Sequence, residues 1–192
     1  MVQHIPNVLT VLRLMLAVPV GLLIAHQQYA VVLIVAFCAG LSDGVDGWIA
    51  RRFNATSRFG SIVDPLADKA LMVATFIGLA SVELLPWWLA LLVIGRDLLI
   101  VGGVIAYHRL TGRIDMEPSL LSKFNTLMQI AYTLSLLLQQ IWPILPQAWF
   151  VGATWGVALL AVITALDYIL TGIHKTRQYA PRAPRQRAPG GD

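Results

Sequence analysis

Residues 42–68 read SDGVDGWIARRFNATSRFGSIVDPLAD and lie between two long apolar runs. This stretch holds four aspartates, Asp43, Asp46, Asp64 and Asp68. Because a carboxylate at the edge of a bilayer is costly to desolvate, such residues point to a functional site. The first two aspartates are three positions apart and the last two are four apart, so on helices each pair shares one face. Two such pairs would form an oxygen cage suited to hard divalent cations.

Four further residues of the stretch lie between the two aspartate pairs: Gly47, Ala50, Arg51 and Gly60. Small residues allow a backbone or a helix to approach a bulky ligand closely. Arg51 is suited to neutralising a phosphate group. An alternative interpretation is that the aspartates form structural ion pairs with nearby basic residues inside a membrane bundle.

These residues form a spaced pattern that can be written Asp43-x2-Asp46-Gly47-x2-Ala50-Arg51-x8-Gly60-x3-Asp64-x3-Asp68. The pattern resembles the signature of the CDP-alcohol phosphatidyltransferase family at all eight fixed positions and at every gap. The resemblance implies an integral-membrane enzyme that moves a phosphatidyl group from CDP-diacylglycerol to an alcohol and releases CMP. Breaking a pyrophosphate requires neutralisation of charge on the attacking and leaving oxygens, which two divalent ions about 3.5–4 Å apart supply in many sites.

The resemblance also implies roles for individual residues of the signature. The expected ligands of two Mg²⁺ or Mn²⁺ ions are the four aspartates, Asp43, Asp46, Asp64 and Asp68. Asp68 is in addition the expected general base. The expected CDP-binding positions are Gly47, Ala50, Arg51 and Gly60.

Composition places the chain among polytopic membrane proteins. Of its 192 residues, 57% are hydrophobic and 12% are charged, and the mean hydropathy is +0.71. These values predict an all-α membrane protein rather than a soluble domain. The apolar runs predict a bundle of six transmembrane helices, over residues 7–25, 30–50, 59–80, 87–107, 119–139 and 149–171. One membrane domain is expected over residues 1–174, followed by a basic, Pro-rich disordered tail over 175–192.

Basic residues are distributed unevenly between the predicted loops. The turns near Gln27, Glu83 and Pro143 contain no Lys or Arg, whereas the other connectors and the tail contain nearly all of them. By the positive-inside rule, both termini and the aspartate cluster face the cytoplasm, and we expect a bacterial cytoplasmic (inner) membrane. Because the net charge of +4 is dispersed between spans, membrane lipid rather than nucleic acid is the expected partner.

The identity of the acceptor alcohol depends on residues outside the signature. The opening IPNVLTVLRL, residues 5–14, is similar to cardiolipin synthases of the CDP-alcohol type and to phosphatidylglycerophosphate synthases. The pair Arg96–Asp97 and residues 118–129, PSLLSKFNTLMQ, are more similar to the cardiolipin synthases. The resemblance therefore favours phosphatidylglycerol as the acceptor and cardiolipin as the product, with glycerol 3-phosphate as the alternative acceptor.

Cations in the second half of the chain are candidates for binding the acceptor: Arg96, Lys123, Arg109 and Arg113. Arg96 has the alternative role of a structural partner for Asp97, and Lys123 that of a residue snorkelling to the interface. A homodimer is also expected from the resemblance, and Gly102 and Gly103 provide a close-packing site for it.

Two other functional classes use acidic clusters in membranes. A small ion-coupled transporter would show paired repeats and a site at the midplane, and the sequence has neither. A prenyl-type transferase also has paired acidic motifs with Mg²⁺. The framework of Gly47, Ala50, Arg51 and Gly60 argues against that class.

Overall fold

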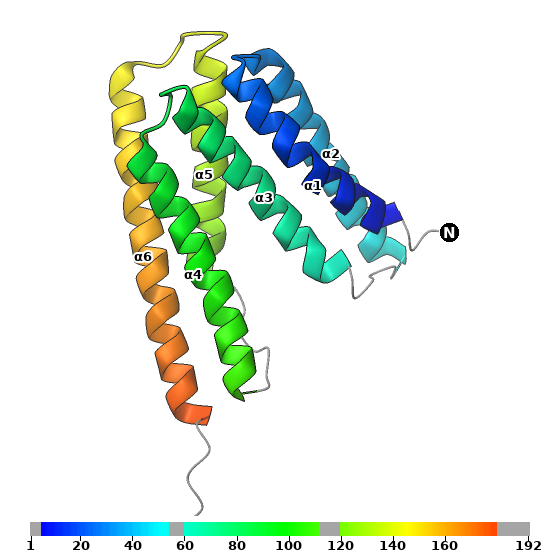
Figure 1. The fold of residues 1–192 in the computed structure, drawn as a ribbon, viewed down its shortest axis with the longest axis vertical. Coiled ribbons are helices and arrows are strands. Elements are labelled where there is room, and N and C mark those ends of the chain that lie inside the picture. The colour runs from blue at the N-terminus through cyan, green and yellow to red at the C-terminus, as the bar shows by residue number, and fades with distance from the viewer. Residues whose placement is uncertain (1–4, 54–59, 112–119, 180–192) are drawn as a thin grey trace, which may run out of the picture.

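The protein is all-helical in the computed structural model, which describes residues 5–53, 60–111 and 120–179 (Figure 1). Six helices and no strands are found in these ranges. Their bounds are α1 Ile5–Ala25, α2 Tyr29–Phe53, α3 Gly60–Ser81, α4 Trp87–Thr111, α5 Leu120–Gln139 and α6 Gln147–Tyr179. The predicted all-α class is therefore confirmed, and each predicted apolar segment coincides with one helix.

Three helices extend further than the apolar runs predict. α2 continues to Phe53, so Arg51 lies on a helix and not in a connector. α4 continues to Thr111, and α6 continues to Tyr179, five residues into the expected tail. The first Pro after the start of α6 is Pro181, so no proline interrupts the helix before Tyr179. The helix dipole also favours the cations near its C-terminus. Residues 180–192 lie outside the described part of the chain.

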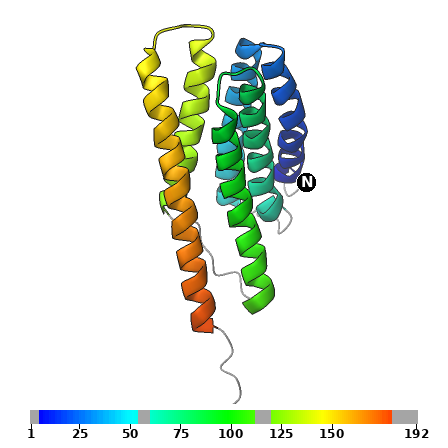
Figure 2. The same ribbon diagram turned by 60° about the vertical axis from the view of Figure 1, so that its left-hand side comes forward.

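The helices form two groups that lie side by side. α1 packs against α2 and α3, and α6 packs against α4 and α5. The groups meet where α3 contacts α4 and where α2 contacts α5 (Figures 1 and 2). Short turns join α1 to α2 and α3 to α4 at one end of the bundle, and each has one residue with positive φ, Gln27 at 59° and Glu83 at 61°.

The core is concentrated near those turns and includes Ile24, Phe76, Leu79 and Leu89, all fully buried. Gly78 allows α1 and α3 to approach closely there. A Cβ at this position would lie 3.1 Å from the Ile24 Cβ. Close packing at one end leaves the opposite ends of α2 and α3 free to diverge from α4 and α6, as Figure 1 shows.

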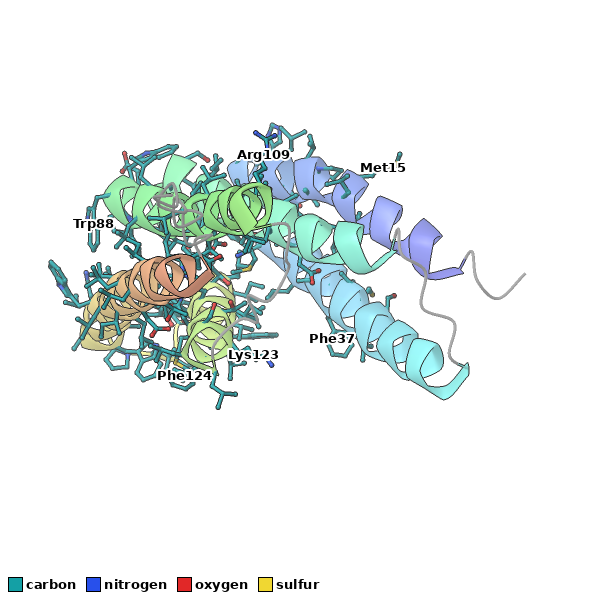
Figure 3. All side chains as sticks on the ribbon, turned by 90° about the horizontal axis from the view of Figure 1, so that it is seen from below. Met15, Phe37, Trp88, Arg109, Lys123 and Phe124 are labelled. Atoms are coloured by element: carbon teal, nitrogen blue, oxygen red, sulfur yellow. The ribbon has the colours of Figure 1, made fainter. Side chains whose placement is uncertain are left out.

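Large apolar side chains cover the outside of the bundle, as expected where lipid replaces water. Figure 3 shows Met15, Trp88 and Phe124 on this outer surface, and their exposed fractions are 67%, 44% and 48%. Trp142 is also exposed and lies in the turn after α5, and the exposed Trp87 and Trp149 lie in the first turns of α4 and α6 at the same end of the bundle. Tryptophans at one level of a bundle are typical of a membrane interface.

The prediction of six membrane spans is supported only in part. Two helical segments in the described residues are long and apolar enough to cross a membrane, Trp87–Ile105 and Gln147–Gly172. Shorter apolar helical segments cover Leu14–Ala25 and Tyr29–Ser42. α5 is less apolar because it carries a buried polar stripe that includes Asn125, Gln129 and Thr133. The side of the membrane that each terminus faces stays a prediction.

The two glycines expected at a dimer interface have different environments. A Cβ on Gly103 would lie 2.8 Å from a ring carbon of Tyr168, so this glycine packs α4 against α6 within one chain. Gly102 is exposed, and a Cβ added there would meet no atom of the described chain within 4 Å. Only Gly102 is therefore free for contact with a second chain, and the homodimer stays a prediction.

Candidate functional site

The eight signature positions lie on two consecutive helices, α2 and α3. Asp43, Asp46, Gly47, Ala50 and Arg51 lie in the C-terminal half of α2, and Gly60, Asp64 and Asp68 lie in the first half of α3. Both aspartate pairs are therefore on helices, about one turn apart, as their spacing predicts. Figure 1 places the two helix ends near each other at the end of the bundle opposite the short turns.

Asp68 is the one aspartate of the four whose side chain is described, and it is exposed. The side chains of the other seven signature residues lie outside the described part, as do residues 54–59. The donor set consists of carboxylate oxygens, which suits Mg²⁺ or Mn²⁺. The residue types and the helical register thus fit two hard cations, and their coordination stays a prediction.

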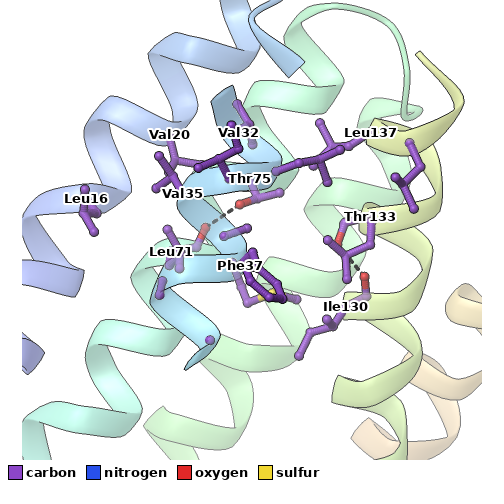
Figure 4. Close-up of a pocket in the computed structure, with 18 of the residues that line it drawn as sticks. Leu16, Val20, Val32, Val35, Phe37, Leu71, Thr75, Ile130, Thr133 and Leu137 are labelled. Atoms are coloured by element: carbon purple, nitrogen blue, oxygen red, sulfur yellow. Dashed lines mark hydrogen bonds between the residues drawn. The ribbon is translucent and has the colours of Figure 1, made fainter. Parts of the chain in front are cut away.

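A cavity of about 1060 Å³ opens between the two groups of helices and reaches Asp68 (Figure 4). Its walls come from α1, α2, α3 and α5 and include Val35, Leu71, Ile130 and Leu137. Along α2 the lining extends from Ala30 to Leu41, which is about 16 Å of helix. This length is about half the roughly 30 Å of bilayer hydrocarbon, so the cavity matches one leaflet.

The cavity offers hydrocarbon rather than hydrogen-bonding groups. Three threonines line it, and each hydroxyl donates to a carbonyl of its own helix. Thr75 donates to Leu71 at 2.8 Å, Thr126 to Ser122 at 3.2 Å and Thr133 to Ile130 at 3.0 Å. Asp68 is the charged residue of the lining, at the opposite end from Trp142. The matching ligand is an amphiphile whose polar end lies at Asp68.

Arg96 is buried at the centre of a polar cluster that joins three helices. Its side chain is 2% exposed and donates from Nε to Thr164 Oγ1 of α6 at 3.1 Å. One terminal nitrogen donates to Asp97 Oδ1 at 2.7 Å and the other to Ser122 Oγ of α5 at 2.7 Å. The geometry matches the structural alternative for Arg96, because these contacts hold its guanidinium in place.

Asp97 extends this cluster to a fourth helix. Its second oxygen, Oδ2, forms an ion pair with Lys69 Nζ of α3, while Oδ1 accepts from Arg96. The Asp97 side chain is 9% exposed and that of Lys69 is 33% exposed. The cluster therefore links the two groups of helices through charge, and it begins one residue after Asp68.

The remaining candidates for binding the acceptor do not lie together in the described structure. Lys123 and Arg109 are exposed, and Figure 3 shows them on opposite sides of the bundle. Arg113 lies outside the described residues. Among the described residues, Lys69 is the cation placed next to the proposed catalytic aspartate. Nothing in the sequence singles it out beyond its position after Asp68, because its partner Asp97 belongs to another helix.

Two buried amides complete the polar stripe of α5. Asn125 is 0% exposed and Gln129 is 2% exposed, and Asn125 Nδ2, Asn125 Oδ1 and Gln129 Nε2 have no hydrogen-bond partner among the described residues. An unpaired buried amide costs about 1–3 kcal/mol. This stripe and Arg96 place buried polar groups between α4, α5 and α6, beside the apolar side chains that the same helices contribute to the core.

Comparison with known proteins identifies the family. The family model for CDP-alcohol phosphatidyltransferase matches residues 3–168. The chain belongs to the CDP-alcohol phosphatidyltransferase family. The resemblance carried by the eight signature positions is thus confirmed over most of the chain.

Relatives within the family carry two different activities in their names. A probable cardiolipin synthase (CMP-forming) of Drosophila melanogaster is 36% identical over 186 residues, covering 88% of this chain and 58% of that protein. The cardiolipin synthase (CMP-forming) of Rattus norvegicus is 35% identical over 142 residues, covering 66% and 47%. A CDP-diacylglycerol–glycerol-3-phosphate 3-phosphatidyltransferase of Aquifex aeolicus is 31% identical over 177 residues, covering 88% and 96%. The chain thus spans about half the length of the two cardiolipin synthases.

Proposed function

We propose that this protein transfers a phosphatidyl group from CDP-diacylglycerol to phosphatidylglycerol and produces cardiolipin and CMP. The observation that carries the proposal is the apolar cavity that ends at Asp68. A lipid whose acyl chain occupies this cavity has its headgroup at the carboxylate end. The alternative is a phosphatidylglycerophosphate synthase with glycerol 3-phosphate as acceptor, the activity named for the Aquifex relative.

The signature residues divide the work at the headgroup. The cytidine diphosphate would bind at Gly47, Ala50, Arg51 and Gly60, where small residues and one cation admit a nucleotide. Two Mg²⁺ or Mn²⁺ ions held by Asp43, Asp46, Asp64 and Asp68 would neutralise the pyrophosphate charge when bound. Asp68 takes the proton of the acceptor hydroxyl. The oxygen of that hydroxyl attacks the phosphatidyl phosphorus, and the bond between this phosphorus and the CMP oxygen breaks.

The distribution of cations supports a lipid acceptor over glycerol 3-phosphate. A small dianion from the cytosol requires several converging cations. Among the described residues, Arg96 is engaged by three partners, and Lys123 and Arg109 point to opposite sides. Phosphatidylglycerol is a monoanion already anchored in the bilayer, so one cation and an apolar cavity suffice for it.

We propose six membrane crossings with both termini in the cytoplasm of a bacterium and the aspartate end of α2 and α3 facing that side. The lack of Lys and Arg in the turns near Gln27, Glu83 and Pro143, at the opposite end, supports this orientation. A thiol introduced at Gln27, in a background without Cys38, should react with an impermeant reagent added outside. Protection of that thiol in intact cells would contradict the orientation.

We also propose a homodimer, which crosslinking in native membranes at low expression tests.

The experiment that tests the function is an acceptor panel on purified protein. CDP-diacylglycerol and Mg²⁺ are combined with phosphatidylglycerol, glycerol 3-phosphate, serine or inositol, and the product is identified by mass. We expect cardiolipin from phosphatidylglycerol and no product from serine or inositol. A product from glycerol 3-phosphate with none from phosphatidylglycerol would overturn the choice of acceptor and establish the alternative.

A further inference from the structure

Lys69 combines a position beside the proposed catalytic residue with a partly exposed charge. It follows Asp68 directly on α3, so their Cα atoms are about 3.8 Å apart. On a helix, consecutive side chains leave the axis about 100° apart. Asp68 accordingly lines the apolar cavity, whereas Lys69 reaches Asp97 of α4. The two side chains therefore point in different directions from neighbouring positions of α3, one to the cavity and one to α4.

The charges of the cluster do not balance. Among the described residues, two cations, Lys69 and Arg96, pair with one carboxylate, that of Asp97. Arg96 is 2% exposed and is held by Thr164 and Ser122 as well. The Lys69 side chain is 33% exposed, and Asp97 is its ion-pair partner among the described residues. The excess positive charge of this cluster is therefore on Lys69, the most accessible of its three charged residues.

A lysine of this kind can take a second anion. The ammonium carries three donors on a flexible four-carbon stem, and Asp97 Oδ2 occupies one direction. Both candidate acceptors carry a phosphate separated from the attacking hydroxyl by the three carbons of a glycerol unit. When that hydroxyl lies at Asp68, its phosphate is a few ångströms away, within reach of the next residue on α3.

We propose that Lys69 binds the phosphate of the acceptor, a glycerol phosphodiester or monoester, and that Asp97 competes with this phosphate for the ammonium. The inference rests on the proposed function, because it takes Asp68 as the reacting end. Lys69 is then a substrate-binding residue, and Asp97 is a positioning residue that weakens acceptor binding while it keeps Lys69 oriented in the empty site.

The test uses Lys69→Met, Lys69→Arg and Asp97→Asn in the full chain. We expect Lys69→Met to raise the KM for phosphatidylglycerol about tenfold while the KM for CDP-diacylglycerol stays within about twofold. Lys69→Arg restores most of the loss, because it keeps the charge. Asp97→Asn lowers the KM for phosphatidylglycerol about threefold, because the competing carboxylate is gone. Glu83→Gln, exposed in a turn at the far end of the bundle, is the control.

Opposite directions for the two partners separate this proposal from a purely structural ion pair. A structural pair would make Lys69→Met and Asp97→Asn change both KM values in the same direction. Such a result would overturn the proposal, as would a Lys69→Met variant with unchanged acceptor KM. If Asp97→Asn does not fold, the contrast between Lys69→Met and Lys69→Arg decides.

A binding measurement separates this inference from the proposed function. Fluorescent phosphatidylglycerol is titrated into wild type and Lys69→Met in detergent without CDP-diacylglycerol, and a parallel arm uses glycerol 3-phosphate as competitor. Weaker binding to Lys69→Met supports the site even if wild type proves to prefer glycerol 3-phosphate. Equal binding to both proteins contradicts the site whatever reaction the enzyme performs. Absence of transfer to any acceptor would refute only the proposed function.

Discussion

At the scale of single residues, the site depends on carboxylates whose roles differ. Asp46 is proposed as a metal ligand, whereas Asp68 is proposed as a ligand and as the base that takes the acceptor proton. Asp68 also lines the apolar cavity, so its side chain would meet the headgroup of a lipid bound there. A charge-removing substitution at each position should therefore have a different consequence.

Asp46→Asn should lose metal binding together with turnover. Asp68→Asn should lose turnover by about 10²-fold or more, because the acceptor proton has no base, while CDP-diacylglycerol still binds. Initial rates and retention of CDP-diacylglycerol on the purified variants provide the measurement, with EDTA-treated wild type as the metal-free reference. Near-normal turnover by Asp68→Asn, or full activity of the EDTA-treated protein, would refute these assignments.

Arg96 should contribute mainly to stability. Arg96→Met removes three hydrogen bonds from a buried cluster, and bonds to charged groups contribute about 1.5–3 kcal/mol each. The Asp97 carboxylate retains its ion pair with Lys69, so the substitution does not leave an unpaired buried charge. We expect the thermal unfolding temperature in detergent to fall clearly, while Arg109→Met, exposed on the same helix, leaves it nearly unchanged. An Arg96→Met variant of wild-type stability with a raised acceptor KM would restore Arg96 to the acceptor site.

The sequence predicts the residues of this site better than their contacts. The aspartates are recognisable because their spacing of three and four fits the helix period whatever the tertiary structure is. Arg96, in contrast, donates hydrogen bonds to Ser122 and Thr164 on two other helices. Lys69 of α3 forms an ion pair with Asp97 of α4. Such pairings depend on how helices are arranged, which an apolar pattern with hydrophobic residues on all sides does not specify.

At the scale of helices, apolar runs predict where each helix lies but not which helices pack together. α1 and α3 pack closely because Gly78 admits Ile24, and α4 packs on α6 because Gly103 admits Tyr168. Both contacts depend on a missing side chain, and several other described glycines serve no such contact. The apolar runs also end earlier than α2, α4 and α6 do, since helices continue into polar sequence until a breaker such as Pro181.

The adjacent glycines of α4 offer a matched pair of variants. Gly103→Ala should destabilise the protein by about 1–3 kcal/mol, because its Cβ would overlap a Tyr168 ring carbon at 2.8 Å. Gly102→Ala meets open space within the described chain and should be neutral or slightly stabilising. Thermal unfolding of both variants checks this contrast. Equal destabilisation would show that Gly102 also packs against something, and a second chain is the candidate.

The apolar cavity between α2 and α5 should select for acyl chains. Val35→Trp places a large ring in this cavity and should raise the KM for long-chain CDP-diacylglycerol or phosphatidylglycerol about tenfold. Short-chain analogues should be less affected, because they leave the deep part of the cavity empty. Leu98→Trp, 68% exposed on α4 and outside the cavity, is the control. Equal effects on short and long chains would show that no acyl chain lies there.

At the scale of the whole molecule, two groups of helices enclose one lipid-sized space between them. The aspartate signature is on one group, and the buried polar residues Arg96, Asn125 and Gln129 are on the other. The cluster of Lys69, Asp97 and Arg96 joins the groups and begins one residue after Asp68. In the proposed reaction, a donor lipid and an acceptor lipid would meet at Asp68 while their chains remain among helices or in the bilayer.

Counting CMP against cardiolipin tests the proposed reaction most directly. Purified protein receives phosphatidylglycerol labelled in its headgroup glycerol, with and without CDP-diacylglycerol, and both products are quantified over time. We predict one CMP released for each labelled cardiolipin formed, and no cardiolipin when CDP-diacylglycerol is omitted. Cardiolipin formed without CDP-diacylglycerol, or CMP released without any labelled cardiolipin, would contradict the proposed transfer to phosphatidylglycerol.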